Sequence, residues 1–304
     1  MRRLLIPLML LAPLGAAFAQ PAGITPEMIN TTLPEEGAPK AVPGAYAVTT
    51  GPAFGNAGLV TFRPASLDRF PRQDTLPVVV WGHGGCAMNA PANYGILETV
   101  ASHGFLVITT AGSAEATPAG GRPRQATADD LKAGLDWAEK ENAREGSPLR
   151  GRIDTQRMAA MGQSCGGIMA VTLGLDPRVD TILVFNAGVD AATTQPGRPT
   201  IDSLKNLHGP VLLINGHERD FQMSASRATF DAIRHVPTFY GARHGAGHTA
   251  TVRHKGGGEF ANVASSWLRW QFKRDEEASK LFVGERCGLC TNPNWDTAAK
   301  LNQP

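Results

Sequence analysis

The chain has 304 residues, of which 42% are hydrophobic and only 18% carry a charged side chain. This composition is enough for a domain-sized core and excludes a wholly disordered chain. There are 29 Lys and Arg against 27 Asp and Glu, and both counts are 27 once Arg2 and Arg3 are set aside, so no excess of basic residues points to nucleic-acid binding.

Residues 1–19 have the pattern of a secretory signal peptide. Arg2 and Arg3 precede an apolar run over residues 4–14, and the small residues Ala17 and Ala19 mark a cleavage site after Ala19. We therefore expect an exported protein, either secreted or periplasmic. No second apolar run approaches the roughly 18 residues that a membrane helix needs, so we expect no membrane span.

Residues 20–53 are rich in Pro, Gly, Thr and Ala without helical periodicity, which predicts an extended N-terminal arm. We expect residues 54–304 to form a single domain, in which short apolar runs alternate with helical stretches. The expected strands cover residues 60–62, 77–81, 105–110, 158–161, 181–185, 211–214 and 238–240. The expected helices cover residues 94–102, 127–144, 165–175, 225–233 and 259–273.

This order of elements predicts the α/β class. Several of the strands are continuously apolar, as strands buried on both faces of a sheet are. Alternation of strand and helix predicts a mostly parallel central sheet with helices on both faces. Residues 188–209 leave room for a loop with at most one short helix, so we expect no large cap domain.

Two glycine-rich turns follow expected strands. The first, His83-Gly84-Gly85-Cys86, lets the backbone approach a reacting carbonyl, and we interpret His83 as a structural turn histidine. The second, Gly162-Gln163-Ser164-Cys165-Gly166, has the Gly-x-Ser-x-Gly pattern of a nucleophile elbow. The alternative is an ordinary turn in a chain with 34 glycines.

A strand precedes the second turn and a helix follows it, so we predict that Ser164 is a nucleophile. The first residue of that helix, Cys165, offers a backbone N–H and the positive end of the helix dipole to an oxyanion. We expect Cys86 in the first turn to supply the second backbone N–H of an oxyanion hole.

In this architecture an acid and then a histidine follow the serine along the chain. Asp220, at the end of an apolar strand, is the predicted acid, with Glu218 as its rival and a surface charge cluster as the alternative. His248, in a glycine-containing loop, is the predicted base, with His244 as its rival. His248 would take the proton of Ser164, Asp220 would orient the imidazole, and water would release an acyl-enzyme.

Metal and cofactor motifs are absent from the sequence. Histidines crowd residues 217–254 but lack a paired spacing such as His-Glu-x-x-His, and the Cys-x-x-Cys at residues 287–290 has no partner pair. We therefore expect no metal and no cofactor. Four cysteines in an exported chain suggest two disulfides, and their spacing leaves all three connectivities open.

These motifs resemble the α/β-hydrolase superfamily, and within it the secreted cutinase-like polyester hydrolases and the platelet-activating-factor-acetylhydrolase-like esterases. The resemblance runs from Leu76 to about Lys273. A group of microbial secreted hydrolases is similar in its Trp-x-x-Gly-Gly-Cys segment, its Gly-Gln-Ser-Cys-Gly-Gly elbow and a terminal Cys-Gly-Leu-Cys followed by a tryptophan. The resemblance implies an α/β-hydrolase fold and a serine esterase.

Cutinase-type polyester hydrolases usually carry an aromatic residue in the oxyanion loop and often another before the nucleophile. This sequence has Cys86 and Gln163 at those positions, so we consider Gln163, Trp81 and Tyr94 as possible substrate contacts.

If Cys86 and Cys165 both supply oxyanion amides, their Cα atoms lie within the roughly 4.4 to 6.8 Å that a disulfide needs. We expect a bridge between them, with two buried free thiols as the alternative. The remaining pair, Cys287 and Cys290, is then expected to close a small C-terminal loop.

We expect a secreted, monomeric serine hydrolase that cleaves carboxylic esters, its substrate being a small-molecule or polymer-borne ester. A polyester hydrolase or a plant-wall feruloyl or acetyl esterase is the same chemistry on a larger substrate. An inactive secreted binding module on the same scaffold is the alternative of another class.

Overall fold

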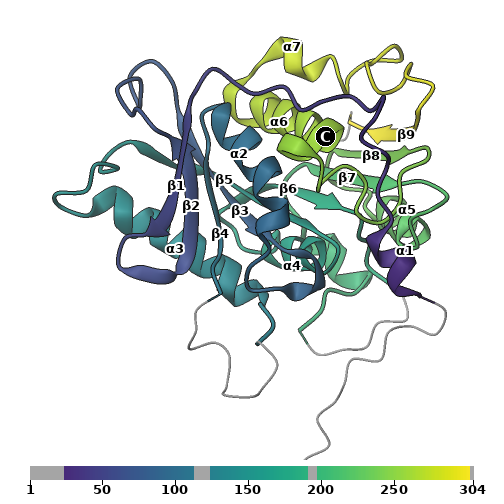
Figure 1. Cartoon of the computed structure of the whole chain (residues 1–304), viewed down its shortest axis with the longest axis horizontal. Coiled ribbons are helices and arrows are strands. Elements are labelled where there is room, and N and C mark those ends of the chain that lie inside the picture. The colour runs from purple at the N-terminus through teal and green to yellow at the C-terminus, as the bar shows by residue number, and fades with distance from the viewer. Residues whose placement is uncertain (1–23, 113–123, 191–196, 302–304) are drawn as a thin grey trace, which may run out of the picture.

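The structure is a computed structural model that describes residues 24–112, 124–190 and 197–301, so the predicted signal peptide lies outside the described residues. A nine-stranded sheet forms its centre, in the order β1-β2-β4-β3-β5-β6-β7-β8-β9 (Figure 1). The strands are β1 (Val48–Ala53), β2 (Asn56–Pro64), β3 (Leu76–Gly82), β4 (Leu106–Thr110), β5 (Ile153–Gln163), β6 (Val179–Phe185), β7 (Val211–Gly216), β8 (Thr238–Arg243) and β9 (Trp295–Lys300). Strands β3 to β8 run parallel, whereas β1, β2 and β9 pair antiparallel at the two edges.

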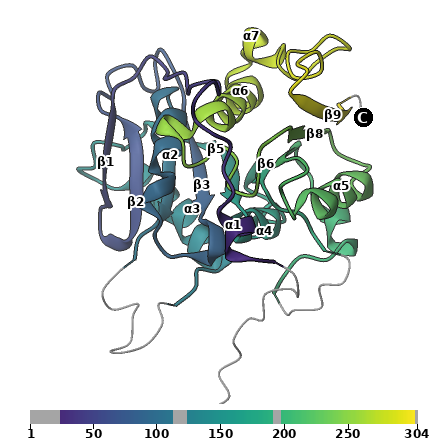
Figure 2. The same cartoon turned by 45° about the vertical axis from the view of Figure 1, so that its right-hand side comes forward.

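Helices cover both faces of this sheet, as Figure 2 shows. The longer ones are α2 (Tyr94–Ser102), α3 (Ala128–Ala143), α4 (Cys165–Leu173), α5 (Met223–Ala232) and α6 (Gly258–Lys273), and the short ones are α1 (Pro26–Asn30) and α7 (Glu276–Ser279). None of the helices in the described residues has the length and apolar character of a membrane span.

Alternate residues of β3 divide the core into two parts. Val78 and Val80 pack into the cluster that contains the buried residues of α3, α4 and α5. Val79 and Trp81 pack into the cluster that contains those of α2 and α6. A strand buried on both faces reads as a continuous apolar run, which is why the sequence predicted these strands. The α/β class and the mostly parallel sheet are confirmed.

Local capping explains where α3 begins. The Asp130 carboxylate accepts hydrogen bonds from the backbone N–H of Thr127 at 2.8 Å and from its hydroxyl at 2.9 Å, which holds the first turn. Beyond that turn, Leu131 and Leu135 are buried on the side that faces the sheet.

Each predicted strand and helix is present, and the elements that the sequence did not predict lie mainly at the edges. Strand β1 contains Gly51 and Pro52, which disfavour a strand but are tolerated at a sheet edge. The other edge strand, β9, carries Asp296 and Lys300 and lacks an apolar run.

The part of the predicted arm that the structure describes includes both α1 and β1. We call residues 24–46 the N-terminal segment. From α1 it runs past α6 toward β1, as both views show (Figure 1, Figure 2). On α6, the Asn262 side chain donates to the carbonyl of Lys40 at 2.8 Å and accepts from the backbone N–H of Val42 at 2.7 Å.

Candidate active site

Ser164 lies at the sharp turn between β5 and α4, with a φ of +56°. This left-handed conformation is strained for a residue with a side chain, and it directs the serine hydroxyl out above the sheet. The flanking glycines are required by close packing: a Cβ atom on Gly162 would overlap the backbone of Gly166, and one on Gly166 would overlap the carbonyl of Gly82. The turn therefore has the geometry of a nucleophile elbow.

Three side chains form one hydrogen-bonded row at this turn. The Ser164 hydroxyl oxygen lies 2.8 Å from Nε2 of His248, and Nδ1 of His248 lies 2.9 Å from Oδ1 of Asp220. His248 and Asp220 are buried. With Nδ1 protonated and donating to the carboxylate, Nε2 is free to accept the serine proton. The structure thus brings together the three residues that the sequence singled out.

The two rivals lie elsewhere. Glu218 accepts from the backbone N–H of Gly245 at 3.1 Å and lies 2.8 Å from Nδ1 of His217, and His244 lies 3.1 Å from Asp296. Within the described residues, neither Glu218 nor His244 has a hydrogen bond to Ser164 or His248.

The Asp220 carboxylate is held by donors on both oxygens. Besides His248, the backbone N–H of Gln222 donates to Oδ1 at 3.1 Å. Oδ2 accepts from the side-chain amide of Asn186 at 2.8 Å and from the backbone N–H of Gly216 at 3.1 Å. These bonds fix the carboxylate in the orientation that faces the imidazole.

Asn186 is a functional candidate that the sequence analysis missed. It directly follows β6, is fully buried and has a φ of +49°, a conformation that asparagine tolerates better than most residues. The only available signal was its position at the carboxyl end of a parallel strand, the edge where ligands and catalytic groups gather.

Replacing Asn186 with leucine is expected to lower kcat about tenfold with little change in KM, because the carboxylate loses one charge-assisted hydrogen bond. Asn215→Leu is the matched control. Asn215 is also a buried amide at a strand end, but its side chain donates to Ser226 at 2.6 Å and has no bond to Asp220. Steady-state kinetics on both variants check the prediction, and equal losses of kcat would contradict it.

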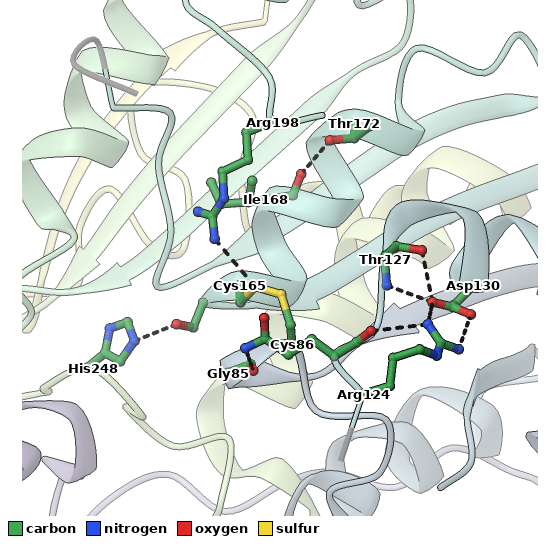
Figure 3. Close-up of a disulfide and its surroundings, with 12 residues drawn as sticks. Gly85, Cys86, Arg124, Thr127, Asp130, Cys165, Ile168, Thr172, Arg198 and His248 are labelled. Atoms are coloured by element: carbon green, nitrogen blue, oxygen red, sulfur yellow. Dashed lines mark hydrogen bonds and ion pairs between the residues drawn. A yellow bond between two sulfur atoms is a disulfide. The ribbon is translucent and has the colours of Figure 1, made fainter. Parts of the chain in front are cut away.

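The two predicted oxyanion donors lie side by side and are joined by a disulfide. Cys86 and Cys165 are bridged with a Cα–Cα distance of 5.2 Å, within the expected range. As the first residue of α4, Cys165 has a backbone N–H without a partner inside the helix. Figure 3 shows the disulfide with Arg198 on one side, its guanidinium 4.0 Å from the Cys165 sulfur. The oxyanion role of both amides stays a prediction.

Replacing both Cys86 and Cys165 with alanine is expected to lower stability by about 4 kcal/mol, because the bridge closes a loop with a sequence separation of 79. We also expect kcat to fall about tenfold, since two preorganised amides lose their common anchor. The second disulfide, between Cys287 and Cys290, provides the control: with a separation of 3, its removal leaves kcat unchanged. Urea unfolding and kinetics measure both effects, and an unchanged kcat in the first variant would refute the anchoring role.

Trp81 and His83 belong to the core beside the site. Trp81 is fully buried, and its indole N–H donates to Nδ1 of His83 at 2.9 Å. The expectation that Trp81 contacts substrate is therefore corrected, because its side chain faces the core. His83 is also fully buried, its Nε2 lies 2.9 Å from the hydroxyl of Thr109, and burial lowers its pKa to about 4. These contacts support its interpretation as a structural histidine.

The lowered pKa of His83 predicts acid sensitivity. The unfolded chain takes up a proton at its ordinary pKa of 6.5, whereas the folded protein does so only near pH 4, so stability is lost as pH falls between these values. By pH 5 the free energy of unfolding is expected to have fallen by about 2 kcal/mol because of this one histidine. Urea unfolding at pH 7 and pH 5 should show this extra loss in the native protein but not in His83→Gln, and equal pH slopes would contradict it.

Gln163 and Tyr94 are the other two residues considered as substrate contacts. The side-chain amide of Gln163 donates to the backbone carbonyl of His248 at 2.9 Å, and Gln163 also lines a small pocket of about 80 Å³ beside the elbow. The Tyr94 hydroxyl donates to Asn89 at 2.8 Å. A residue that the sequence did not indicate, Phe221, packs on the imidazole of His248 with ring centroids 4.1 Å apart.

One cluster near the site has the donor atoms of a metal site. His217, His244 and Asp296 come from the ends of β7, β8 and β9, and their ligand atoms lie within 4.8 Å of one another. The imidazole of His217 lies 2.8 Å from Asp296 and 2.8 Å from Glu218. These residues could hold a metal ion. The sequence analysis predicted no metal, because these three ligands are brought together by strand order and follow no local spacing.

A comparison with protein families found one match. A family model described as PET hydrolase-like matches residues 73–287, which is more than half of the chain. The matched range contains the turn at residues 83–86, the elbow, Asp220 and His248. A search of the curated proteins found no match.

Proposed function

This chain belongs to the PET hydrolase-like family, and we propose that it is a secreted serine esterase in which Ser164, His248 and Asp220 form the catalytic triad. Membership of a family of polyester hydrolases makes the chain a carboxylic ester hydrolase. The observation that carries the triad assignment is the row of hydrogen bonds from Asp220 through His248 to Ser164.

The reaction follows from this row. As the Ser164 oxygen attacks the ester carbonyl carbon, Nε2 of His248 takes the hydroxyl proton, and Asp220 stabilises the resulting imidazolium. The carbonyl oxygen becomes an oxyanion, for which the backbone N–H groups of Cys86 and Cys165 are the proposed donors. Collapse of the tetrahedral intermediate breaks the bond to the alcohol, which leaves with the proton held by His248.

The second half of the reaction repeats the first with water. His248, again neutral, takes a proton from water as its oxygen attacks the acyl-enzyme carbonyl. A second tetrahedral intermediate collapses, the bond to Ser164 breaks and the serine oxygen regains its proton from His248. The carboxylic acid is released and the enzyme returns to its starting state.

A site that is not covered by a large cap domain would admit bulky or polymer-borne esters as substrates. Between β6 and β7, the described residues form one short 3₁₀ helix, Asp202–Asn206. The aromatic residues usual in cutinase-type enzymes are replaced by Cys86 and Gln163, so recognition of an aromatic polymer unit would depend on other groups, such as Phe221. Secretion is supported by the signal pattern and by two disulfides, which persist in oxidising compartments.

Hydrolysis of p-nitrophenyl butyrate by the mature chain, starting at Gln20, tests the proposal. We expect turnover by the native enzyme and less than about 0.1% of it in Ser164→Ala with unchanged circular dichroism. Product release from polyester films then separates polymer from small-ester specificity. An active Ser164→Ala variant would reject Ser164 as the nucleophile.

A further inference from the structure

The N-terminal segment docks on the loop that carries His248. The backbone carbonyl of Thr31 accepts two hydrogen bonds from Thr249, one from its N–H at 3.0 Å and one from its hydroxyl at 3.0 Å. The N–H of Leu33 donates to the carbonyl of Ala250 at 3.1 Å. Three hydrogen bonds therefore tie the segment to the two residues that directly follow His248.

These contacts continue along the same loop. Arg253 donates to the side chain of Asn30 at 3.1 Å, and Nε2 of His254 lies 2.6 Å from the carbonyl of Leu33. The backbone N–H of Lys255 donates to Glu35 at 2.9 Å. Residues 30–35 thus run along the loop from residue 249 to residue 255 and make hydrogen bonds to five of its seven residues.

On the other side of His248, the segment and the loop are in close contact. Gly247 directly precedes His248, and the three atoms nearest to a Cβ added there all belong to Thr31. The added atom would overlap all three: two are side-chain carbons, and the third is the carbonyl oxygen at 2.8 Å. Gly247 is therefore the residue that lets Thr31 pack against the loop at this point.

The loop conformation needs such support. Ala250 is fully buried with a φ of +44°, a left-handed conformation that costs a non-glycine residue free energy and persists only where its surroundings hold it. Its N–H donates to the carbonyl of Gly247 at 3.0 Å, and its carbonyl is the one that accepts from Leu33. From the sheet side, Gln163 donates to the carbonyl of His248 at 2.9 Å. The loop is thus held between the elbow and the N-terminal segment.

We propose that residues 24–36 of the N-terminal segment are a positioning element of the active site, which holds the His248 loop so that Nε2 faces Ser164. This inference rests on the proposed catalytic role of His248. The segment supplies no group to the reaction. The contacts next to His248 are made largely by the backbone of Thr31 and Leu33, which explains why neither composition nor a motif marked the segment as functional.

The first test is a chain that starts at Gly37 and so keeps the contacts of Lys40 and Val42 with α6. We expect kcat for p-nitrophenyl butyrate to fall at least about tenfold, because small misplacements of a catalytic group have large effects on rate, whereas KM changes by less than about twofold. A synthetic peptide with the sequence of residues 20–36, added to the truncated enzyme, should restore kcat in a saturable way.

A pair of substitutions in the full chain tests the same contact without truncation. Gly247→Ala should lower kcat by a similar factor, because the new methyl group displaces Thr31. Adding Thr31→Gly removes the two overlapping carbons and should recover part of the activity. Asn262→Ala is the matched control, since it breaks two hydrogen bonds to the segment at Lys40 and Val42 and should leave kcat unchanged.

The outcomes separate cleanly. A folded truncated chain with native kcat would overturn the inference. If the truncated chain fails to fold, the substitution pair decides, and failure of Thr31→Gly to recover any activity in the Gly247→Ala background would overturn it. Absence of Ser164-dependent hydrolysis in the full-length enzyme would reject the proposed function, and this inference with it.

Discussion

Replacing His248 with alanine is expected to lower kcat for p-nitrophenyl butyrate by about 10⁶-fold. Nε2 of His248, 2.8 Å from the Ser164 oxygen, is the only side-chain base hydrogen-bonded to that oxygen among the described residues. Without it the serine hydroxyl stays protonated and is a weak nucleophile. The rate that remains is expected to come from substrate binding and from the proposed oxyanion amides, and end-point assays over many hours measure it.

His244→Ala is the control for this variant. The two histidines are four positions apart, and either could have been the base from its place in the sequence. His244 is half-buried, and its Nε2 lies 3.1 Å from Asp296. We expect its replacement to change kcat less than about twofold, as for a surface substitution. A comparable loss in both variants would mean that the histidine was wrongly assigned.

The Asp220→Asn variant is expected to lose about 10⁴-fold in kcat while it keeps its fold. The reason lies in the donors around the carboxylate. Oδ2 accepts from Asn186 at 2.8 Å and from the backbone N–H of Gly216 at 3.1 Å, so the amide oxygen of the replacement must occupy that position. The amide NH₂ then faces His248 and forces the tautomer in which Nδ1 is unprotonated. In that tautomer Nε2 already carries a proton and cannot accept one from Ser164.

Glu218→Gln provides the comparison for the acid. Glu218 stands two residues before Asp220 but bonds to Gly245 and His217, away from the imidazole of His248. We expect kcat to stay within about twofold of the native value. If Glu218→Gln lost activity as Asp220→Asn does, the single-acid account would fail. Thermal unfolding of both variants distinguishes a lost catalytic group from a lost fold.

The sequence was most informative where function depends on local geometry. The elbow needs glycines at fixed positions around Ser164 because the turn is crowded, so a short pattern between a strand and a helix identifies it. The order of serine, acid and histidine along the chain follows from the strand topology, so Asp220 and His248 could be predicted from the sequence.

Contacts between distant segments left no such pattern. Asn186 reaches Asp220 because β6 and β7 are neighbours in the sheet. Thr31 reaches Thr249 because the N-terminal segment folds back across the loop, a pairing separated by 218 positions. The burial of Trp81 could not be predicted from the sequence either, because the side chains at the end of a strand that is buried on both faces can point to the core or to the site. These features depend on tertiary packing, and no local sequence pattern indicates them.

The most direct test of the central claim is to find which residue becomes covalently modified during inhibition. The mature enzyme should be treated with diethyl p-nitrophenyl phosphate, digested and analysed by peptide mass spectrometry. We predict one diethylphosphoryl group per chain, located on Ser164, appearing in step with the loss of esterase activity and absent from His248→Ala over the same time. A modified residue other than Ser164 in the inactivated enzyme would contradict the account.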